Sequence, residues 1–225
     1  MTNPKPRPAP PRVRLSGSAP DADQLVQAGT ASTGSAEEAL AIAETRAWVE
    51  RAVIGLNLCP FAKAVQARQR IRYACSGAKD VEALLAAFCA EVRLLLDAAP
   101  ADIETTVLVH PFVLADFDDY NDFLDLVDAA LDALGATGIV QVASFHPHYR
   151  FEGTAPDDIG NATNRSPYPT LQLLREDSIE AATAAFPDSA AIYKANIATL
   201  QALGPAGWHA LQDACRRDAQ ASGKG

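Results

Sequence analysis

Apolar positions along the chain follow two periods, one typical of helices and one typical of strands. Helical spacing marks stretches that begin at Ser35, Asp80 and Phe117, and helix returns from Ser178 with breaks at Pro187 and Gly204. Short apolar runs rich in β-branched residues predict strands at 71–74, 103–110, 139–146 and 170–175. This alternation predicts an α/β or α+β fold with a small, partly parallel sheet of about four strands and helices packed on it. We expect the fourth strand to join as an antiparallel or edge member.

The N-terminal region differs from the rest of the chain in proline content and charge. Residues 1–35 are rich in proline, which lacks the N–H group of helix and sheet hydrogen bonds, so they predict a disordered tail. Residues 36–217 predict one globular domain and 218–225 a disordered C-terminal end. Four of the 19 basic side chains lie in the first 20 residues, which leaves 15 against 28 acidic ones, a net −13. The tail is either a solvated leader or a basic arm that docks on the acidic body or on a partner.

Composition and charge exclude several classes of protein. No apolar run is long enough to span a membrane, so we expect no membrane association. A net charge of −9 disfavours general binding of nucleic acid, whose affinity depends on neutralising phosphates. The four cysteines form neither a CxxC pair nor a disulfide framework, and no N-terminal apolar run resembles a secretory signal. These observations predict a cytoplasmic protein.

The second and third predicted strands both end in a His-Pro pair, at His110 and His146. If the helix between them is a standard crossover, the strands are parallel and both histidines lie at the carboxyl edge of the sheet. Open α/β sheets bind ligands at this edge, which makes the two imidazoles candidates for catalysis. The alternative is that each His-Pro pair only ends its strand, with the imidazole capping loop carbonyls.

Cys59 is a second candidate, in the run from Leu56 to Lys63. Pro60 suits the first position of a helix, which would make Cys59 the N-cap and expose its thiol to unpaired N–H groups and the positive end of the helix dipole. Both effects lower the pKa of a thiol and favour the thiolate. The alternative is an inert thiol buried among the neighbouring apolar residues.

The loop 147–169 is long for a compact domain and rich in hydrogen-bonding side chains. Loops of this length are usually functional or disordered, and its aromatic residues favour packing. An arginine fork suits a carboxylate or phosphate, so the loop predicts an anion site. Its candidate ligands are Asn164, Arg165, Ser166, Tyr168 and Arg175, with Arg150 as a further cation. The alternative is that Arg165 pairs with Asp157 or Asp158 and pins the loop.

Three separate segments together resemble the bacterial family called domain of unknown function 1415. They are Gly-Leu-Asn-Leu-Cys-Pro-Phe-Ala at 55–62, Ser-Phe-His-Pro-His-Tyr-Arg-Phe at 144–151 and Thr-Asn-Arg-Ser-Pro-Tyr-Pro-Thr-Leu-Gln-Leu-Leu-Arg-Glu at 163–176. The resemblance covers about residues 37–200 and implies a compact soluble domain, but no activity. In the family pattern, His often stands in place of Gln172 and Asp in place of His148, so the pattern does not support His148 as a catalytic group.

These candidates support three hypotheses. The favoured one is an enzyme acting on a small anionic substrate, with Cys59 as nucleophile or redox thiol, His146 as base, and His110 as orienter or second base. The second is a zinc site made by the same three side chains, with an open position for water. The third is a binding or regulatory module in which the Arg165 loop recognises an anion without catalysis. The sequence assigns no reaction class.

Overall fold

A computed structural model describes residues 35–184 and 189–222 of the chain. The tail predicted for 1–35 therefore lies outside the described residues except for Ser35, and the helix break expected at Pro187 lies outside them too. Within the described part, no helix is both long and apolar enough to cross a membrane.

The core of the fold is a four-stranded sheet in the order β1-β2-β4-β3. Strand β1 (Ile71–Cys75) pairs in parallel with β2 (Thr105–Val109), whereas β4 (Thr170–Arg175) is antiparallel to both β2 and β3 (Val140–Phe145). Strands β1, β2 and β3 thus run in one direction, and their carboxyl ends share one edge of the sheet. The predicted partly parallel sheet is confirmed, and β4 joins it as an antiparallel strand in the middle rather than at the edge.

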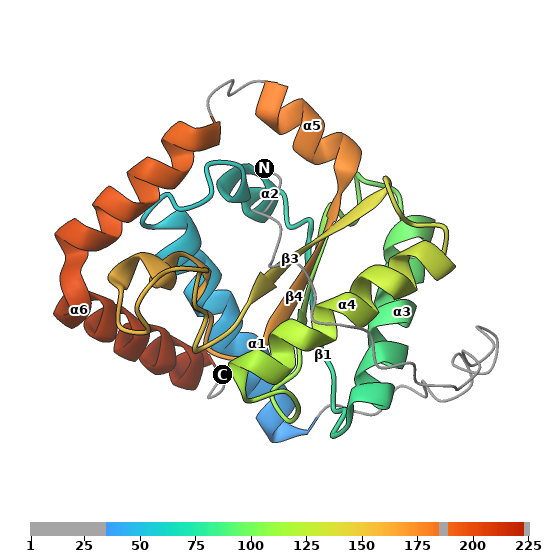
Figure 1. Ribbon diagram of the computed structural model, residues 1–225, viewed down its shortest axis with the longest axis horizontal. Helices are drawn as coiled ribbons and strands as arrows, with labels where there is room; N and C mark the ends of the chain where they lie inside the picture. The colour runs from blue at the N-terminus through green and yellow to red at the C-terminus, as the bar shows by residue number, and fades with distance from the viewer. Residues whose placement is uncertain (1–34, 185–188, 223–225) are drawn as a thin grey trace.

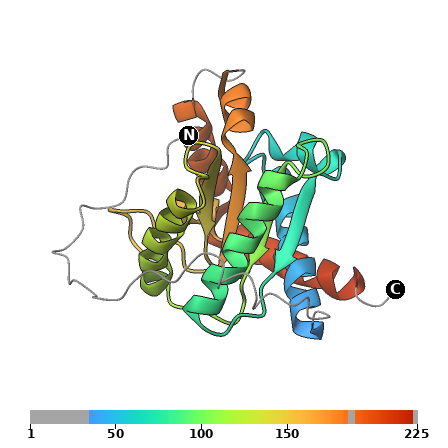
Figure 2. The ribbon, with the colours of Figure 1, turned by 90° about the vertical axis from the view of Figure 1, so that its right-hand side faces the viewer.

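Helices cover both faces of the sheet (Figure 1). One face carries α3 (Val81–Asp97) and α4 (Phe117–Ala133), and we call it the α3/α4 face. The opposite, α1/α6 face carries α1 (Ala36–Trp48), the π-helix η1 (Val49–Ile54) and α6 (Ser189–Ser222). Figure 2 shows α3 and α4 in front of the sheet with α1 and α6 behind it. The short helices are α2 (Ala62–Ala67), η2 (Ile159–Asn164) and α5 (Glu176–Ala184).

The long helices begin where the sequence supplies a side chain that caps free backbone N–H groups. Ser35 Oγ accepts the N–H of Glu38 at the start of α1, and Asp80 Oδ1 accepts the N–H of Ala83 at the start of α3. At the start of α4, Asp116 Oδ1 accepts two backbone N–H groups, from residues 118 and 119. A capping oxygen of this kind stabilises a helix by about 1 kcal/mol, so these starts follow from local sequence.

Alternation along the strands divides their side chains between two hydrophobic cores. Leu108, Leu171 and Leu173 belong to the core on the α3/α4 face, with Phe88 and Tyr120 from the helices. Val107 and Val109 of β2 pack on the opposite face, as does Phe145 of β3, which meets the Trp48 ring edge-on at 5.4 Å. Because successive strand residues point to opposite faces, the residue number at the end of a strand decides which face its side chain occupies.

The predicted C-terminal boundary at residue 217 is wrong. Helix α6 continues to Ser222, with Ala219 buried and the Asp218 carboxylate held by the Arg51 guanidinium of η1. This packing stabilises a last helical segment that its polar composition alone does not predict. The predicted break at Gly204 is present as a kink, where glycine takes a φ of 66°.

Candidate functional site

His110 and His146 follow β2 and β3 directly, and both lie on the α3/α4 face at the carboxyl edge. Their side chains are fully buried. The Tyr120 ring of α4 lies between them, 5.7 Å from the ring of His110 and 5.1 Å from that of His146. The predicted meeting of the two histidines at one edge therefore matches the structure.

Each imidazole donates a hydrogen bond to a carbonyl of the loop between β2 and α4. His110 Nδ1 lies 3.3 Å from the carbonyl oxygen of Val113, and His146 Nε2 lies 3.1 Å from that of Leu114. The backbone N–H of His148 donates to His146 Nδ1 at 3.0 Å. Because a carbonyl only accepts, His110 carries its proton on Nδ1 and His146 carries its proton on Nε2. This is the alternative in which the imidazoles cap loop carbonyls.

The environment keeps both imidazoles neutral. Burial lowers the pKa of His110 to about 4, and the nearby His146 lowers it further, against the bond to Val113. Burial also lowers the pKa of His146, as does His148, while the Leu114 carbonyl and Asp116 act in the opposite direction. Both nitrogens of His146 are already engaged, so it has no lone pair with which to act as a general base.

Tyr120 ties the end of β3 to the start of β4 beside the histidines. Its hydroxyl donates to the carbonyl of Thr170 at 2.8 Å and accepts the N–H of Phe145 at 3.1 Å. Full burial raises the pKa of this phenol, so it remains a neutral structural bridge. The partners of its hydroxyl come from strands distant in sequence, so no local pattern predicts this bridge.

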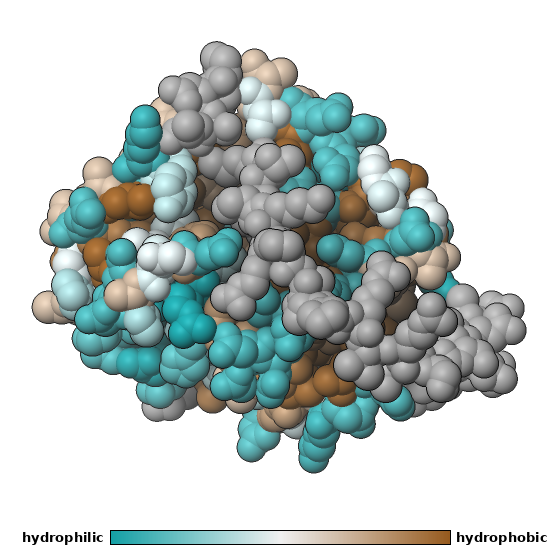
Figure 3. All heavy atoms as spheres, in the orientation of Figure 1, coloured by the Kyte–Doolittle hydropathy of each residue, from teal (hydrophilic) through white to brown (hydrophobic). Residues whose placement is uncertain are grey.

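A pocket of about 390 Å³ opens at this edge, outside the buried histidines. One wall is Ala115–Asp118, at the start of α4, and the other comes from loop 147–169. The residues from that loop are Pro147, His148, Arg150, Pro156 and Arg165. Mainly hydrophilic side chains face the solvent where this loop and the first turn of α4 lie (Figure 3). The volume suits a small molecule.

The cations of the pocket are held in different ways. Arg165 Nε donates to the carbonyl of Tyr149, and its Nη2 donates to that of Pro156, so the guanidinium is fixed to the loop. Burial lowers its pKa, and Asp157 and Asp158 counteract this, although an arginine in a protein stays charged. Arg165 thus pins the loop through carbonyls, with the two aspartates nearby. Arg150 makes an exposed ion pair with Asp118 at 3.1 Å.

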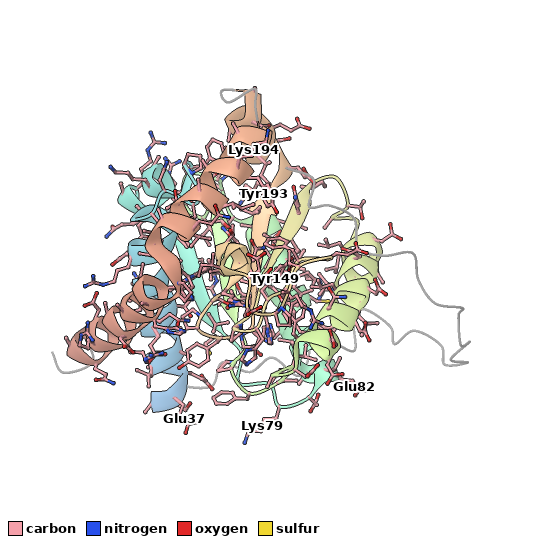
Figure 4. All side chains as sticks on the ribbon, turned by 60° about the vertical axis from the view of Figure 1, so that its left-hand side comes forward. Glu37, Lys79, Glu82, Tyr149, Tyr193 and Lys194 are labelled. Carbon is pink, nitrogen blue, oxygen red and sulfur yellow. The ribbon has the colours of Figure 1, made fainter. Side chains whose placement is uncertain are left out.

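Aromatic rings support the loop behind the pocket. The Tyr149 ring packs edge-on against Phe117 at 5.2 Å and against Phe151 at 5.0 Å, and Phe151 in turn contacts Tyr193 of α6 at 6.2 Å. Figure 4 shows Tyr149 in the middle of the molecule and Tyr193 above it on α6. The long loop is therefore packed, as its aromatic content predicts.

Cys59 does not meet the histidines. It follows Leu58, which is buried in the core of the α1/α6 face, and the Leu58 carbonyl accepts a hydrogen bond from Asn196 of α6. The helix expected at Pro60 instead begins at Ala62, so Cys59 is not its N-cap. Burial raises the pKa of the thiol, although the backbone N–H groups of residues 61 and 62 lower it. These positions favour the alternative of an inert thiol.

The segment before Cys59 has an unusual backbone, which explains the error in the predicted helix start. The π-helix η1 brings the carbonyl of Arg51 so close to Gly55 that a Cβ there would lie 2.2 Å from its oxygen. Asn57 then takes a φ of 55°, and the N–H groups of residues 58 and 59 both point to the Val53 carbonyl. The Cys59 carbonyl accepts the N–H of Ala62 in a further turn, and the helix begins only at Ala62.

Of the five residues expected to bind an anion, only Arg165 lines the pocket, together with Arg150, the further cation of that prediction. Asn164 Nδ2 donates to the Ser144 carbonyl and its own carbonyl accepts the N–H of His146, so it fastens the loop to β3. Ser166 Oγ donates to the carbonyl of Tyr168, and the Tyr168 hydroxyl donates to Glu44 of α1 on the opposite face. Residue type and closeness in sequence predict the other four as anion ligands, but neither indicates on which side of the sheet a side chain lies.

Arg175 lies at the far end of β4, away from the pocket. Its guanidinium donates to the carbonyls of Leu95, Ala98 and Ile103, at distances of 2.7 to 3.2 Å, and so closes the C-terminal end of α3. The anion-binding role predicted for it is wrong, because antiparallel β4 carries its last residue to the edge where β2 begins.

The zinc alternative has no geometric support. Over residues 35–184 and 189–222, no group of three His, Cys, Asp or Glu side chains is arranged to hold a metal ion. Cys59 follows Leu58 of the core on the α1/α6 face, whereas His110 and His146 lie on the α3/α4 face. The β-sheet therefore separates the thiol from the two imidazoles.

Two residues of the site have no strong sequence signal. Leu114 takes a φ of 59°, which glycine adopts freely because it has no Cβ but which a leucine rarely adopts. Phe117 forms pocket wall as well as helix stripe. His148 was visible in the His-Pro-His run, but only the structure places its imidazole in the pocket.

Comparison with known proteins identifies a family but no function. The model of the family described as "Protein of unknown function (DUF1415)" matches residues 40–210. No curated protein matches the chain significantly, and no solved structure does.

Proposed function

The chain belongs to the DUF1415 family, and we propose that this member binds a small anionic molecule, of the carboxylate or phosphate class, in the pocket at the carboxyl edge. The observation that carries the proposal is the convergence of Arg150, Arg165 and His148 on one pocket of a strongly acidic chain. The net negative charge of the protein repels anions on average. Cationic and hydrogen-bonding side chains that line one pocket would attract an anion to that place.

The two arginines have complementary roles in this proposal. Arg165 is already oriented by two backbone carbonyls, so little side-chain entropy is lost when it binds an anion. Arg150 makes an exposed ion pair with Asp118, which is worth about 0–1 kcal/mol, and its guanidinium lies 6.0 Å from the centre of the Phe117 ring, so it is less firmly fixed than Arg165 and can turn to a ligand. Phe117, Pro147 and Pro156 add apolar wall for the body of the ligand.

His148 is the histidine placed for proton transfer in this pocket, although the family pattern does not support it as a catalytic group. Its imidazole is exposed and lines the pocket, whereas the imidazole of His146 is buried with both nitrogens bonded. An enzyme of this kind performs general acid–base chemistry on a bound anion. We also propose that the protein works in a reducing cytoplasm, which is supported by the absence of a disulfide among its four cysteines.

The proposal is tested by isothermal titration calorimetry with sulfate and with succinate. We expect Arg165→Gln and Arg150→Gln each to weaken binding by about tenfold or more, because a charge-assisted hydrogen bond is lost. Arg68→Gln is the matched control, since it removes the same charge from an exposed position on the other side of the molecule. Absence of binding by the unmodified protein, or equal weakening by Arg68→Gln, overturns the proposal.

A further inference from the structure

The β2–α4 loop forms one wall of the pocket and contains a strained residue. Leu114, with its φ of 59°, lies directly before the wall residues Ala115–Asp118. A leucine in this region of φ/ψ costs free energy and persists only where surrounding contacts fix it. The contacts here are two imidazole N–H groups on successive carbonyls, from His110 to Val113 and from His146 to Leu114.

Both donated bonds survive protonation, but the bond that His146 accepts from the His148 backbone requires a neutral imidazole. A proton added to His146 Nδ1 would face the backbone N–H of His148, which now donates to that nitrogen. The bond would be replaced by a repulsion between two donors, and the loop that carries His148 and Arg150 would move. His110 Nε2 is buried with no hydrogen-bond partner among the described residues, so a proton there would add a buried charge with no acceptor.

On the basis of the proposed function, we propose that His110 and His146 are positioning residues that hold both walls of the anion pocket only while they are neutral, so that protonation of His146 releases the bound anion. His146 connects the two walls directly, since one of its nitrogens bonds to Leu114 and the other to His148. Anion affinity then falls as pH falls through the pKa of His146.

The groups around His146 act in different directions. From α4, Asp116 favours its protonation, and Tyr120 and Phe117 pack against its ring. From its own loop, His148 opposes protonation, and His110, which follows β2 on the far side of β4, repels a second charge. His148 is replaced in the functional test, because its side chain lines the anion pocket itself.

The hydrogen bonds make a spectroscopic prediction that involves no ligand. Long-range ¹H–¹⁵N correlation spectra of the full chain distinguish the two neutral imidazole tautomers. We expect the Nδ1–H tautomer for His110 and the Nε2–H tautomer for His146. The exposed His209 of α6 supplies an internal reference. The opposite tautomer at His146, or an imidazolium there at neutral pH, overturns the proposal.

The functional test measures sulfate affinity against pH in a His148→Gln background. Sulfate keeps its charge over the range of about pH 4.5 to 8, in which a histidine titrates. We expect affinity to fall by up to about tenfold per pH unit below the pKa that NMR gives for His146, the limit for one linked proton. Adding His146→Gln should remove this slope, since glutamine can donate to Leu114 but does not ionise, whereas adding His209→Gln should leave it intact.

The outcomes separate this inference from the function on which it rests. Correct tautomers without any sulfate binding contradict the proposed function but leave the histidine clamp in place. Sulfate binding whose affinity is constant or rises as His146 becomes protonated overturns the clamp but leaves the anion site. If His146→Gln does not fold, two measurements still decide the question. They are the tautomers, and whether sulfate affinity in the His148→Gln protein begins to fall at the pKa that NMR gives for His146.

Discussion

Arg165 and Arg175 use the same bonds at opposite edges of one sheet, with different consequences. Both donate to backbone carbonyls, but Arg175 closes the end of α3 and Arg165 lines an open pocket. Residue type does not distinguish the two, since both are arginines, and neither does distance along the chain, since only ten positions separate them. The direction of β4 separates them, because Arg165 lies in the loop before β4 at the carboxyl edge and the strand then runs to the opposite edge, where it ends at Arg175.

The largest effect on stability is expected at Arg175, on the edge of the sheet where β1 and β2 begin. Arg175→Met leaves the carbonyls of Leu95, Ala98 and Ile103 without their charged donor and should lower the free energy of unfolding by about 2–4 kcal/mol. Urea denaturation measures this loss. Sulfate affinity of the folded fraction should not change, and a loss of affinity would show that the two edges are coupled.

Acid should destabilise the carboxyl edge through His110. Its pKa is about 4 in the folded protein, against 6.5 for an unperturbed histidine, so the unfolded chain binds the proton more tightly. The stability from this histidine is complete above about pH 6.5 and is lost as pH falls toward 4, by up to about 3 kcal/mol. His110→Asn, whose amide can still donate to Val113, should reduce this loss in urea melts at pH 7 and pH 4. Equal acid sensitivity of both proteins would contradict the assignment.

A smaller difference is expected at the other candidate site. Because burial raises the pKa of Cys59, its thiol should react with iodoacetamide at neutral pH more slowly than an unstructured cysteine peptide. Cys59→Ala should cost about 1 kcal/mol of stability and leave sulfate affinity unchanged. Mass spectrometry of the alkylated protein measures the rate, and rapid labelling of Cys59 would restore the thiol hypothesis.

Local sequence predicts the elements of this fold better than their arrangement. Ser35 and Asp80 cap helices where helical spacing predicts the starts, α4 begins at Phe117 as predicted, and β4 has the bounds that its apolar run predicts. Insertion of β4 between β2 and β3 depends on pairing between distant segments, which no local pattern encodes. The false helix start at Pro60 has the same origin, because the π-helix before it is stabilised by packing on α6.

The sequence predicts where the candidate site lies, at the carboxyl edge of the sheet, but not which residues line it. Parallel crossover placed His110 and His146 together, and strand alternation fixes their face once the strand ends are known. Cys59 lies in a turn, where no alternation applies, so its face followed only from the structure. Leu114 carries the strain of the loop, and nothing in its residue type indicates that backbone.

The central claim is that an anion binds at the carboxyl edge, and amide chemical-shift mapping with sulfate tests it most directly. The account predicts saturable shifts at Ala115–Asp118, His148, Arg150 and Arg165, and none around Arg175 or Cys59. Shifts centred on Cys59, or shifts spread over the surface without saturation, would contradict it.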